Sequence, residues 1–175
     1  MSTTQWTLNI ALLAWVLLRN VGTRPLDRAA FTVPLLVVGV AAGIFLRDVP
    51  TAGNDVTLDV LFASAGLALG LVATALTRIR LDGGRLFVTA GAAFAGLWMA
   101  VIGGRIVFAE WATGAGSRSV GQFSRDHLIT GADAWTAAFV LMALAMVLGR
   151  LVTTAFVATA SRRRLTAPVA ATVGA

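Results

Sequence analysis

The sequence predicts an all-α integral membrane protein, a bundle of five transmembrane helices with its N-terminus outside the cell and its C-terminus in the cytoplasm. Two features of composition indicate the membrane: hydrophobic residues make up 58% of the 175-residue chain, and charged residues make up only 13%. Soluble domains carry about 25% charged residues. A third feature, the position of arginines between apolar runs, indicates how the chain crosses the bilayer. We expect residues 1–164 to form a single membrane domain.

Five apolar runs have about the length that a helix needs to cross a bilayer, which is roughly 20 residues. They cover residues 4–21, 29–46, 56–76, 86–111 and 133–160. Pro34 lies inside the second run and is expected to kink that helix. The last two runs exceed the minimum, so we expect them to tilt or to extend beyond the bilayer. Residues 165–175 show no apolar periodicity and are predicted to be a disordered cytoplasmic tail.

The segments between these runs are predicted to be turns and loops. Residues 77–85 contain Asp82, Gly83 and Gly84, which favour a tight turn. Residues 112–131 are rich in glycine and serine, so we expect a long loop there.

Two pairs of polar residues are expected to cap helices. Asn54 and Asp55 precede the third apolar run, where a polar side chain can accept hydrogen bonds from the first free N–H groups of a helix. Thr130 and Asp133 stand at the spacing of a capping box, with Asp in the place of the usual Glu. This pair predicts where the fifth helix begins.

The arginines predict the orientation of the chain. Nine of the fourteen lie in three clusters at or beyond the ends of predicted helices: Arg19, Arg24 and Arg28; Arg78, Arg80 and Arg85; and Arg162, Arg163 and Arg164. Only two acids accompany these clusters, whereas the opposite side of the predicted bundle holds four arginines and six acids. Since arginine-rich loops stay in the cytoplasm, the clusters mark the inner side. Topology thus explains the high isoelectric point, and we expect no nucleic-acid partner.

Small residues recur every fourth position on three of the predicted helices. The small-residue stripes are Gly39 and Gly43; Gly66, Gly70 and Thr74; and Ala92, Gly96, Ala100 and Gly104. Such stripes let helix backbones approach closely in lipid. We interpret them as packing surfaces within the bundle. The alternative is a homo-oligomer interface or a pore lined by glycine backbone.

Ionisable residues near the outer ends of the helices are candidates for a functional site, since charges in a membrane are costly. Arg105 and Glu110 lie near the end of the fourth helix. Arg105 is interpreted as an interfacial arginine paired with an acid, or alternatively as the anchor of an outward-facing cavity for an anionic ligand. Asp55 and Asp59 share one face of the third helix. They favour the positive end of the helix dipole, or alternatively bind a cation or transfer protons.

His127 and Asp133 complete the candidate outer polar cluster, which comprises Arg105, Glu110, Asp59, Asp55, His127 and Asp133. One histidine does not make a zinc site, which needs three or four ligands, and the chain has no cysteine. We therefore expect no metal and no cofactor, with haem ligation by His127 and a methionine as an alternative. Arg150 is interpreted as an arginine that extends its side chain to the inner headgroups.

The sequence contains no motif for catalysis or phosphate binding in a plausible setting. We therefore expect a non-enzymatic, multi-pass protein of a bacterial plasma membrane that serves as an accessory or scaffold of a membrane assembly. Its partners would be the lipid bilayer and either another membrane protein or a second copy of itself. The alternative is a small transporter or channel with an outer polar vestibule. An enzyme acting on lipid, or a haem-handling protein, is a third hypothesis.

Two stretches resemble the CcdC-like family of small multi-pass bacterial membrane proteins. The first is residues 19–26 followed by Pro34 in an apolar run; the second joins Gly66 and Gly70 through residues 77–85 to Leu97, Trp98 and Arg105. The resemblance implies a helical membrane protein associated by name with cytochrome c maturation, and it implies no catalytic residues. Because cysteine is absent, this chain itself has no thiol with which to reduce a partner.

Overall fold

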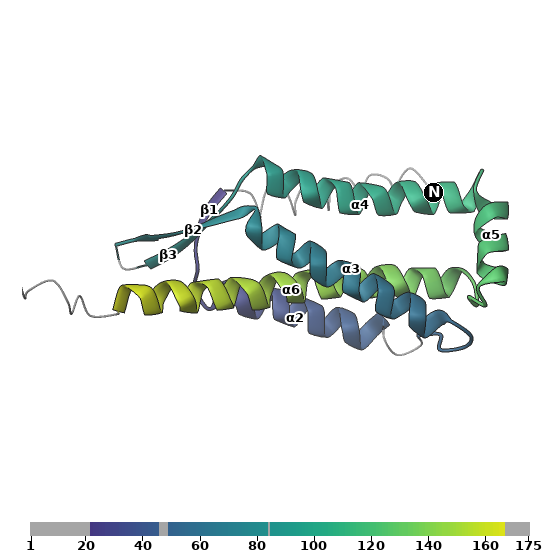
Figure 1. Ribbon diagram of the computed structural model, residues 1–175, viewed down its shortest axis with the longest axis horizontal. Coiled ribbons are helices and arrows are strands. Elements are labelled where there is room, and N and C mark those ends of the chain that lie inside the picture. The colour runs from purple at the N-terminus through teal and green to yellow at the C-terminus, as the bar shows by residue number, and fades with distance from the viewer. Residues whose placement is uncertain (1–21, 46–48, 84, 167–175) are drawn as a thin grey trace, which may run out of the picture.

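A computed structural model describes residues 22–45, 49–83 and 85–166 of the chain. Four helices run alongside one another down the long axis, α2 (Ala29–Phe45), α3 (Asp55–Ala75), α4 (Ala92–Thr113) and α6 (Ala132–Thr166), and α5 (Ser117–Asp126) lies across one end (Figure 1). Three strands occupy the opposite end. We call these the α5 end and the sheet end. The predicted first helix, residues 4–21, lies outside the described residues.

Three of these helices are apolar and long enough to span a membrane: Asp55–Ala75, Ala92–Thr113 and Ala132–Ala160. The 17 residues of α2 extend about 25 Å at 1.5 Å per residue, slightly less than a hydrocarbon core. Large apolar side chains face outward, with Leu36 69% exposed and Phe156 72% exposed. Such surfaces are rare on soluble monomers. The helices therefore indicate a membrane-inserted protein.

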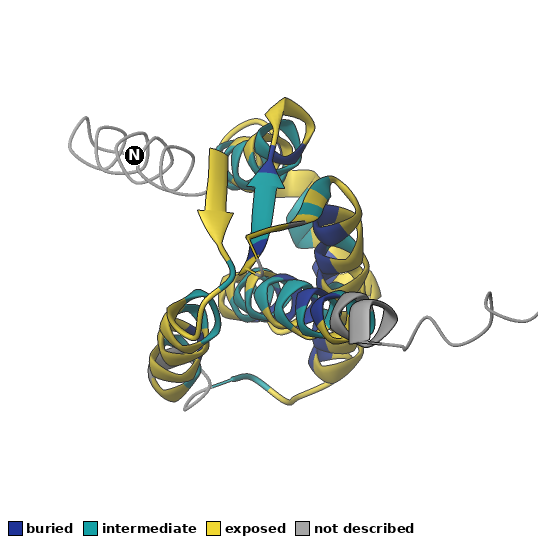
Figure 2. Ribbon diagram, turned by 90° about the vertical axis from the view of Figure 1, so that its left-hand side faces the viewer, coloured by how far each residue is buried: buried dark blue, intermediate teal, exposed yellow. Residues whose placement is uncertain are grey.

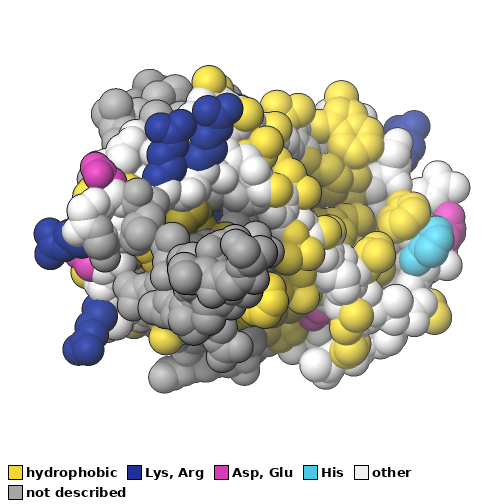
Figure 3. Space-filling model, turned by 60° about the vertical axis from the view of Figure 1, so that its left-hand side comes forward, with side chains coloured by type: hydrophobic (Ala, Val, Ile, Leu, Met, Phe, Trp, Pro, Cys, Tyr) yellow, Lys and Arg dark blue, Asp and Glu magenta, His cyan; other side chains and the backbone are white. Residues whose placement is uncertain are grey.

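Figure 3 shows how charge is distributed around this apolar surface. Apolar side chains form a band across the middle, arginines gather at one end, and the histidine lies at the other. The chain runs back and forth between these two ends. The arginine-bearing strands and the C-terminal part of α6 therefore lie at the same end (Figure 1). The clusters at residues 78–85 and 162–164 were predicted to lie on one side of the membrane, and the arrangement of the described helices agrees with this prediction.

The centre of the fold is the contact between α3 and α6. A Cβ atom added at Gly66 would overlap the carbonyl of Met142, and one at Gly70 would overlap the backbone of Met146. The hydroxyl of Thr74 lies 3.4 Å from the carbonyl oxygen of Arg150, to which it donates. Viewed along the bundle, buried residues concentrate where these two helices meet (Figure 2). The prediction that this stripe packs within the bundle is confirmed.

The other two stripes have no such neighbour in the described part of the chain. A Cβ atom added at Gly39 or Gly43 of α2, or at Gly96 or Gly104 of α4, would meet nothing within 4 Å. Instead, α4 reaches the core through aromatic side chains. The buried ring of Phe94 packs in a cluster with Ala73, Ala90 and Met146.

A three-stranded antiparallel sheet closes one end, and the all-α prediction omitted it. The strands are β1 (Gly22–Pro25), β2 (Thr77–Asp82) and β3 (Arg85–Ala90), in the order β1-β3-β2. The predicted tight turn at residues 77–85 is part of a β-hairpin, in which Asp82 pairs with Arg85 and Gly83 takes a positive φ of 53°. Polar and apolar residues alternate along β2, as expected for a strand.

Three further elements differ from the prediction. The fourth helix begins at Ala92 and not at residue 86, because residues 86–90 pair with β1 and β2. The predicted loop at residues 112–131 contains α5, whose Ser124 accepts a 3.1 Å hydrogen bond from the indole of Trp135. Helix α6 begins at Ala132 and reaches Thr166, so the first two residues of the predicted tail are helical. The rest of the tail lies outside the described residues.

Candidate functional site

All six residues of the predicted outer polar cluster lie toward the α5 end. Asp55 and Asp59 begin α3, Arg105 and Glu110 lie in the second half of α4, His127 follows α5, and Asp133 begins α6. Neither of the two main cavities of the described chain is lined by any of them. Within the described ranges, no three His, Cys, Asp or Glu side chains are placed to hold a metal ion.

Asp55 joins the start of α3 to the loop that precedes α6. Its side chain is buried, with 1% exposed, and one carboxylate oxygen accepts a 2.9 Å hydrogen bond from the backbone N–H of Thr130. The other oxygen accepts a bond from the Thr130 hydroxyl. We call this pair the Asp55–Thr130 latch. At the start of α6 the carbonyl of Gly131 accepts a 3.4 Å bond from the N–H of Trp135. Gly131 and not Thr130 is therefore the N-cap, and the predicted capping box is wrong.

Asn54 strengthens the same connection. Its side-chain amide donates to the carbonyl of His127 at 3.0 Å, and its backbone N–H donates to the carbonyl of Leu128 at 3.0 Å. Asn54 stands at the N-cap of α3, as predicted, but its side chain makes no capping bond. The predicted position is confirmed and the predicted capping bond is wrong. The side chain and the backbone N–H of Asn54 both join the start of α3 to the segment that leads into α6. Asn54 therefore has a structural role.

The remaining members of the cluster do not converge around a cavity. Asp59 is 8% exposed, and one of its oxygens has no hydrogen-bond partner among the described residues. Arg105 and Asp133 are exposed. The ring of His127 is exposed and stacks on Phe123, with ring centroids 4.0 Å apart.

The principal cavity lies at the sheet end, between α2, α6 and the sheet. It encloses about 520 Å³, within the range of about 300–1,000 Å³ typical of ligand pockets. Its walls are mostly apolar side chains of α2 and α6, and its charged lining residues in the described chain are Arg24 and Arg150. We call it the arginine cavity.

The pairing of the strands directs Arg24 to this cavity. Arg24 stands opposite Val88 of β3 in the register of the sheet, and directly opposed residues lie on the same face. Val88 and Ala90, two residues apart on β3, both line the cavity. In contrast, Arg80 stands opposite Phe87, and thus lies on the other face of the sheet.

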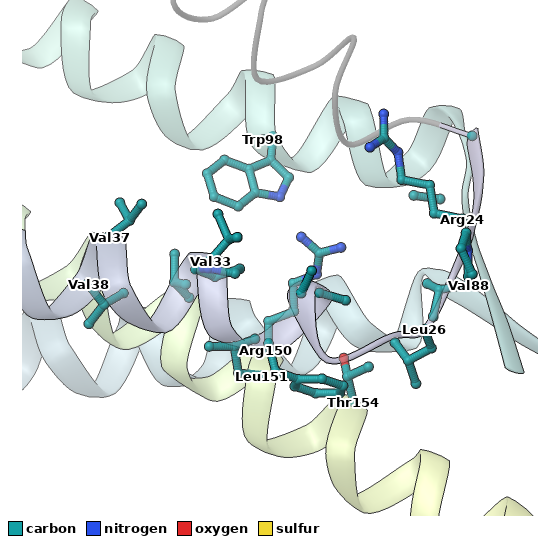
Figure 4. A pocket seen from close by; sticks show the side chains of 18 of the residues that line it. Arg24, Leu26, Val33, Val37, Val38, Val88, Trp98, Arg150, Leu151 and Thr154 are labelled. Carbon is teal, nitrogen blue, oxygen red and sulfur yellow. The ribbon is translucent and has the colours of Figure 1, made fainter.

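Arg150 enters the cavity from the apolar helix α6. The carbon atom at the centre of its guanidinium lies 4.5 Å from the ring centroid of Phe94, a distance at which a cation is attracted to an aromatic face. Figure 4 shows the guanidinium pointing toward the indole of Trp98. The indole nitrogen of Trp98 is buried and has no hydrogen-bond partner within the described chain.

Chemically, this arrangement can hold an anion. Two guanidinium groups and one indole N–H are all donors, and none of them can accept a hydrogen bond. The sequence interpretation missed this site because it gave Arg150 no neighbours in the fold and treated it only as an arginine that reaches the inner headgroups. The available signal was that Arg150 is the only charged residue between Asp133 and Arg162, and a lone charge in an apolar helix is a functional candidate.

Comparison of the chain with protein-family models, with curated proteins and with solved structures gives no match. The resemblance to the CcdC-like family therefore stays a prediction, together with what it implies. The function has to be inferred from the geometry.

Proposed function

We propose that this chain is a non-enzymatic, multi-pass protein of a bacterial plasma membrane that serves as an accessory or scaffold of a membrane assembly. In this proposal the chain crosses the membrane five times, with residues 4–21 as the first crossing. The N-terminus and the α5 end face outward, and the sheet end faces the cytoplasm.

The observation that carries the proposal is the apolar band between two polar ends of different charge. The sheet end bears Arg24, Arg78, Arg80 and Arg85, all exposed. The α5 end combines arginines with acids, among them Asp126 and Asp133. Because positively charged loops stay in the cytoplasm, this asymmetry supports an inward-facing sheet.

The stripe on α4 supports an accessory role. Exposed Ala92, Ala100 and Gly104, together with the half-buried Gly96, form a narrow apolar face, and no described side chain comes within 4 Å of a Cβ atom added at either glycine. In lipid, helices associate through such faces because they allow close contact. We propose that another transmembrane helix packs against this stripe.

The alternative, a transporter or channel with an outer vestibule, has less support. Such a vestibule needs polar groups that converge on a cavity, whereas the carboxylate of Asp55 is occupied by Thr130 and the Arg105 side chain is exposed. The arginine cavity lies at the opposite end.

The orientation is tested by cysteine labelling, for which the cysteine-free chain is well suited. We would introduce Ser117→Cys in α5 or Asp82→Cys in the hairpin, both at exposed positions, and treat intact cells with a membrane-impermeant maleimide. Ser117→Cys should react in intact cells, and Asp82→Cys should react only after permeabilisation. Labelling of Asp82→Cys and not Ser117→Cys from outside would overturn the proposed orientation, and labelling of both sites in intact cells would show that α4 does not cross the membrane.

A further inference from the structure

We propose that the arginine cavity binds one anionic phospholipid, whose phosphate contacts Arg24, Arg150 and Trp98 and whose acyl chains lie against α2 and α6. This inference goes beyond the proposed function, which concerns topology and assembly and requires no ligand. The surrounding bilayer supplies the occupant, so no soluble ligand has to be delivered.

The charge of the lining selects an anion. Among the described residues that line the cavity, no acid accompanies Arg24 and Arg150. Arg150 contacts the ring of Phe94, and no carboxylate of the described chain lines the cavity beside it. An aromatic ring offers no oxygen acceptor, so this contact leaves the N–H groups of the guanidinium in need of hydrogen-bond acceptors. A ligand with several acceptor oxygens satisfies these donors.

Trp98 supplies a third donor on the opposite side of the same space. Its indole N–H is buried without a partner in the described chain, although buried polar groups are nearly always hydrogen-bonded. Figure 4 places this nitrogen above the guanidinium of Arg150, with Arg24 entering from β1. An anion located between them accepts hydrogen bonds from α4, α6 and β1 together.

The walls favour a lipid over a soluble anion. Val33 and Val37 of α2 and Leu144 and Val147 of α6 line the cavity, and the exposed side chains of Leu36 and Val40 continue the apolar surface along α2. A soluble phosphate gains nothing from these side chains, whereas acyl chains bury apolar area against them.

The depth of the cavity also suits a lipid headgroup. Arg150 lies beside the last turns of α3, through Gly70 and Thr74, and beside Phe94 in the first turn of α4. Arg150 thus lies at the depth in the membrane at which two membrane-spanning helices end. This is the boundary between the apolar band and the sheet end, where a phospholipid carries its phosphate.

A phosphate matches these donors better than a carboxylate does. Guanidinium groups bind phosphate oxygens through parallel hydrogen bonds, and a phosphate diester offers oxygens to more than one donor group at a time. A phosphate diester has two anionic oxygens, as a carboxylate does, and two ester oxygens in addition, so it offers more acceptors to three donor groups from three elements. The site therefore favours a phospholipid over a fatty acid.

Native mass spectrometry of the purified full-length chain in a neutral detergent tests the proposal. We would titrate dioleoyl phosphatidylglycerol and, separately, dioleoyl phosphatidylcholine, which share their acyl chains and differ in net charge. One phosphatidylglycerol should bind per chain, and phosphatidylcholine should not displace it. Arg24→Gln and Arg150→Gln should each raise the Kd about 10- to 100-fold, as expected for loss of a charged hydrogen bond.

Two further variants make the result specific. Arg80→Gln removes the same charge from the same end, but on the opposite face of the sheet, and should leave the Kd unchanged. Val33→Phe keeps both arginines and fills part of the cavity, so it should weaken binding even if Arg150→Gln fails to fold. Helical circular dichroism identifies the variants that are folded.

Several outcomes would overturn the proposal. Equal loss of binding in Arg80→Gln would show a diffuse attraction to the basic end, and equal affinity for phosphatidylcholine would show that charge is not selected. Displacement by sodium phosphate at an equal concentration would identify a soluble-anion site. Displacement by oleate at an equal concentration, with the same dependence on Arg24 and Arg150, would identify a fatty-acid site. None of these outcomes bears on the labelling test of topology.

Discussion

Helices α3 and α4 carry the same kind of small-residue stripe, but the structure uses the two stripes differently. On α3, Gly66 and Gly70 lie so close to α6 that an added Cβ atom would overlap backbone atoms. On α4, a Cβ atom added at Gly96 or Gly104 would meet nothing within 4 Å in the described chain. The spacing of small residues therefore predicts that a helix can be approached closely, but not by which helix. Four substitutions test this contrast.

The largest effect is expected from Gly66→Leu. The new side chain would collide with the backbone at Met142, which cannot move without separating α3 from α6. The free energy of unfolding should fall by about 3 kcal/mol or more, since overpacking typically costs roughly 1–3 kcal/mol and this collision is with backbone. Unfolding of the purified protein in mixed micelles containing an ionic detergent would measure it. An unchanged stability would mean that α3 and α6 are farther apart than described.

Asp55→Asn tests the second attachment of α3, the Asp55–Thr130 latch. An amide offers one acceptor oxygen where the carboxylate offers two, so one Thr130 donor loses its partner. We expect a loss of about 1.5–3 kcal/mol in the free energy of unfolding, as for other hydrogen bonds to charged groups. Asp126→Asn, at an exposed carboxylate at the end of α5, is the matched control. Equal effects of both changes would argue against the latch.

Phe108→Leu tests how α4 is attached. The ring of Phe108 lies 5.4 Å from that of Trp135 and 5.2 Å from that of Phe139, between centroids. Replacing it removes these two aromatic contacts with α6 and a third with Trp111 of α4 itself, and contacts of this kind contribute about 0.5–1.5 kcal/mol each beyond burial. Thermal unfolding in detergent should show a modest decrease relative to Phe156→Leu, which changes an exposed ring. No difference between the two variants would mean that α4 is held elsewhere.

The smallest effect is expected from Gly96→Ala, and its sign is opposite. The added methyl group meets nothing within 4 Å, and replacing glycine in a helix without strain stabilises a protein by about 0.4–1 kcal/mol. Gly70→Ala, measured in the same way, should lower the stability. If Gly96→Ala also lowers it in the purified monomer, then another part of the chain packs on the α4 stripe. The contrast with α3 would then disappear.

The sequence allowed α2, α3, α4 and α6 to be predicted because their apolar runs are long, whereas the polar helix α5 was missed. The bounds of α2 and α3 lie within about a residue of the prediction, and α6 begins one residue early. The start of α4 was misplaced because β3 is as apolar as the helix that follows it, and hydropathy alone does not distinguish a strand from a helix. The alternation Arg78, Ile79, Arg80 followed by Asp82 and Gly83 was the available hairpin signal.

The candidate site was harder to predict than the helices. Arg24, Trp98 and Arg150 come from three elements, and they approach one another only because β1 pairs with β3 and α6 packs against α3. A single sequence contains no direct record of either contact. For the predicted cluster at the α5 end, the sequence indicated the correct end of the bundle but not the contacts of the side chains. Its residues lie toward the same end, but Asp55 is bonded to a threonine 75 positions away, which no capping rule anticipates.

That separation has a consequence for biogenesis. The ribosome delivers α3 long before α6, and domains emerge from their N-terminal side first. Until Thr130 and the helix after it have been made, the glycine face of α3 has no partner and the carboxylate of Asp55 has no donor from this loop. The central helix pair can therefore assemble only near the end of synthesis. A chain interrupted before Ala132 would leave α3 inserted but unpaired, a natural substrate for membrane quality control.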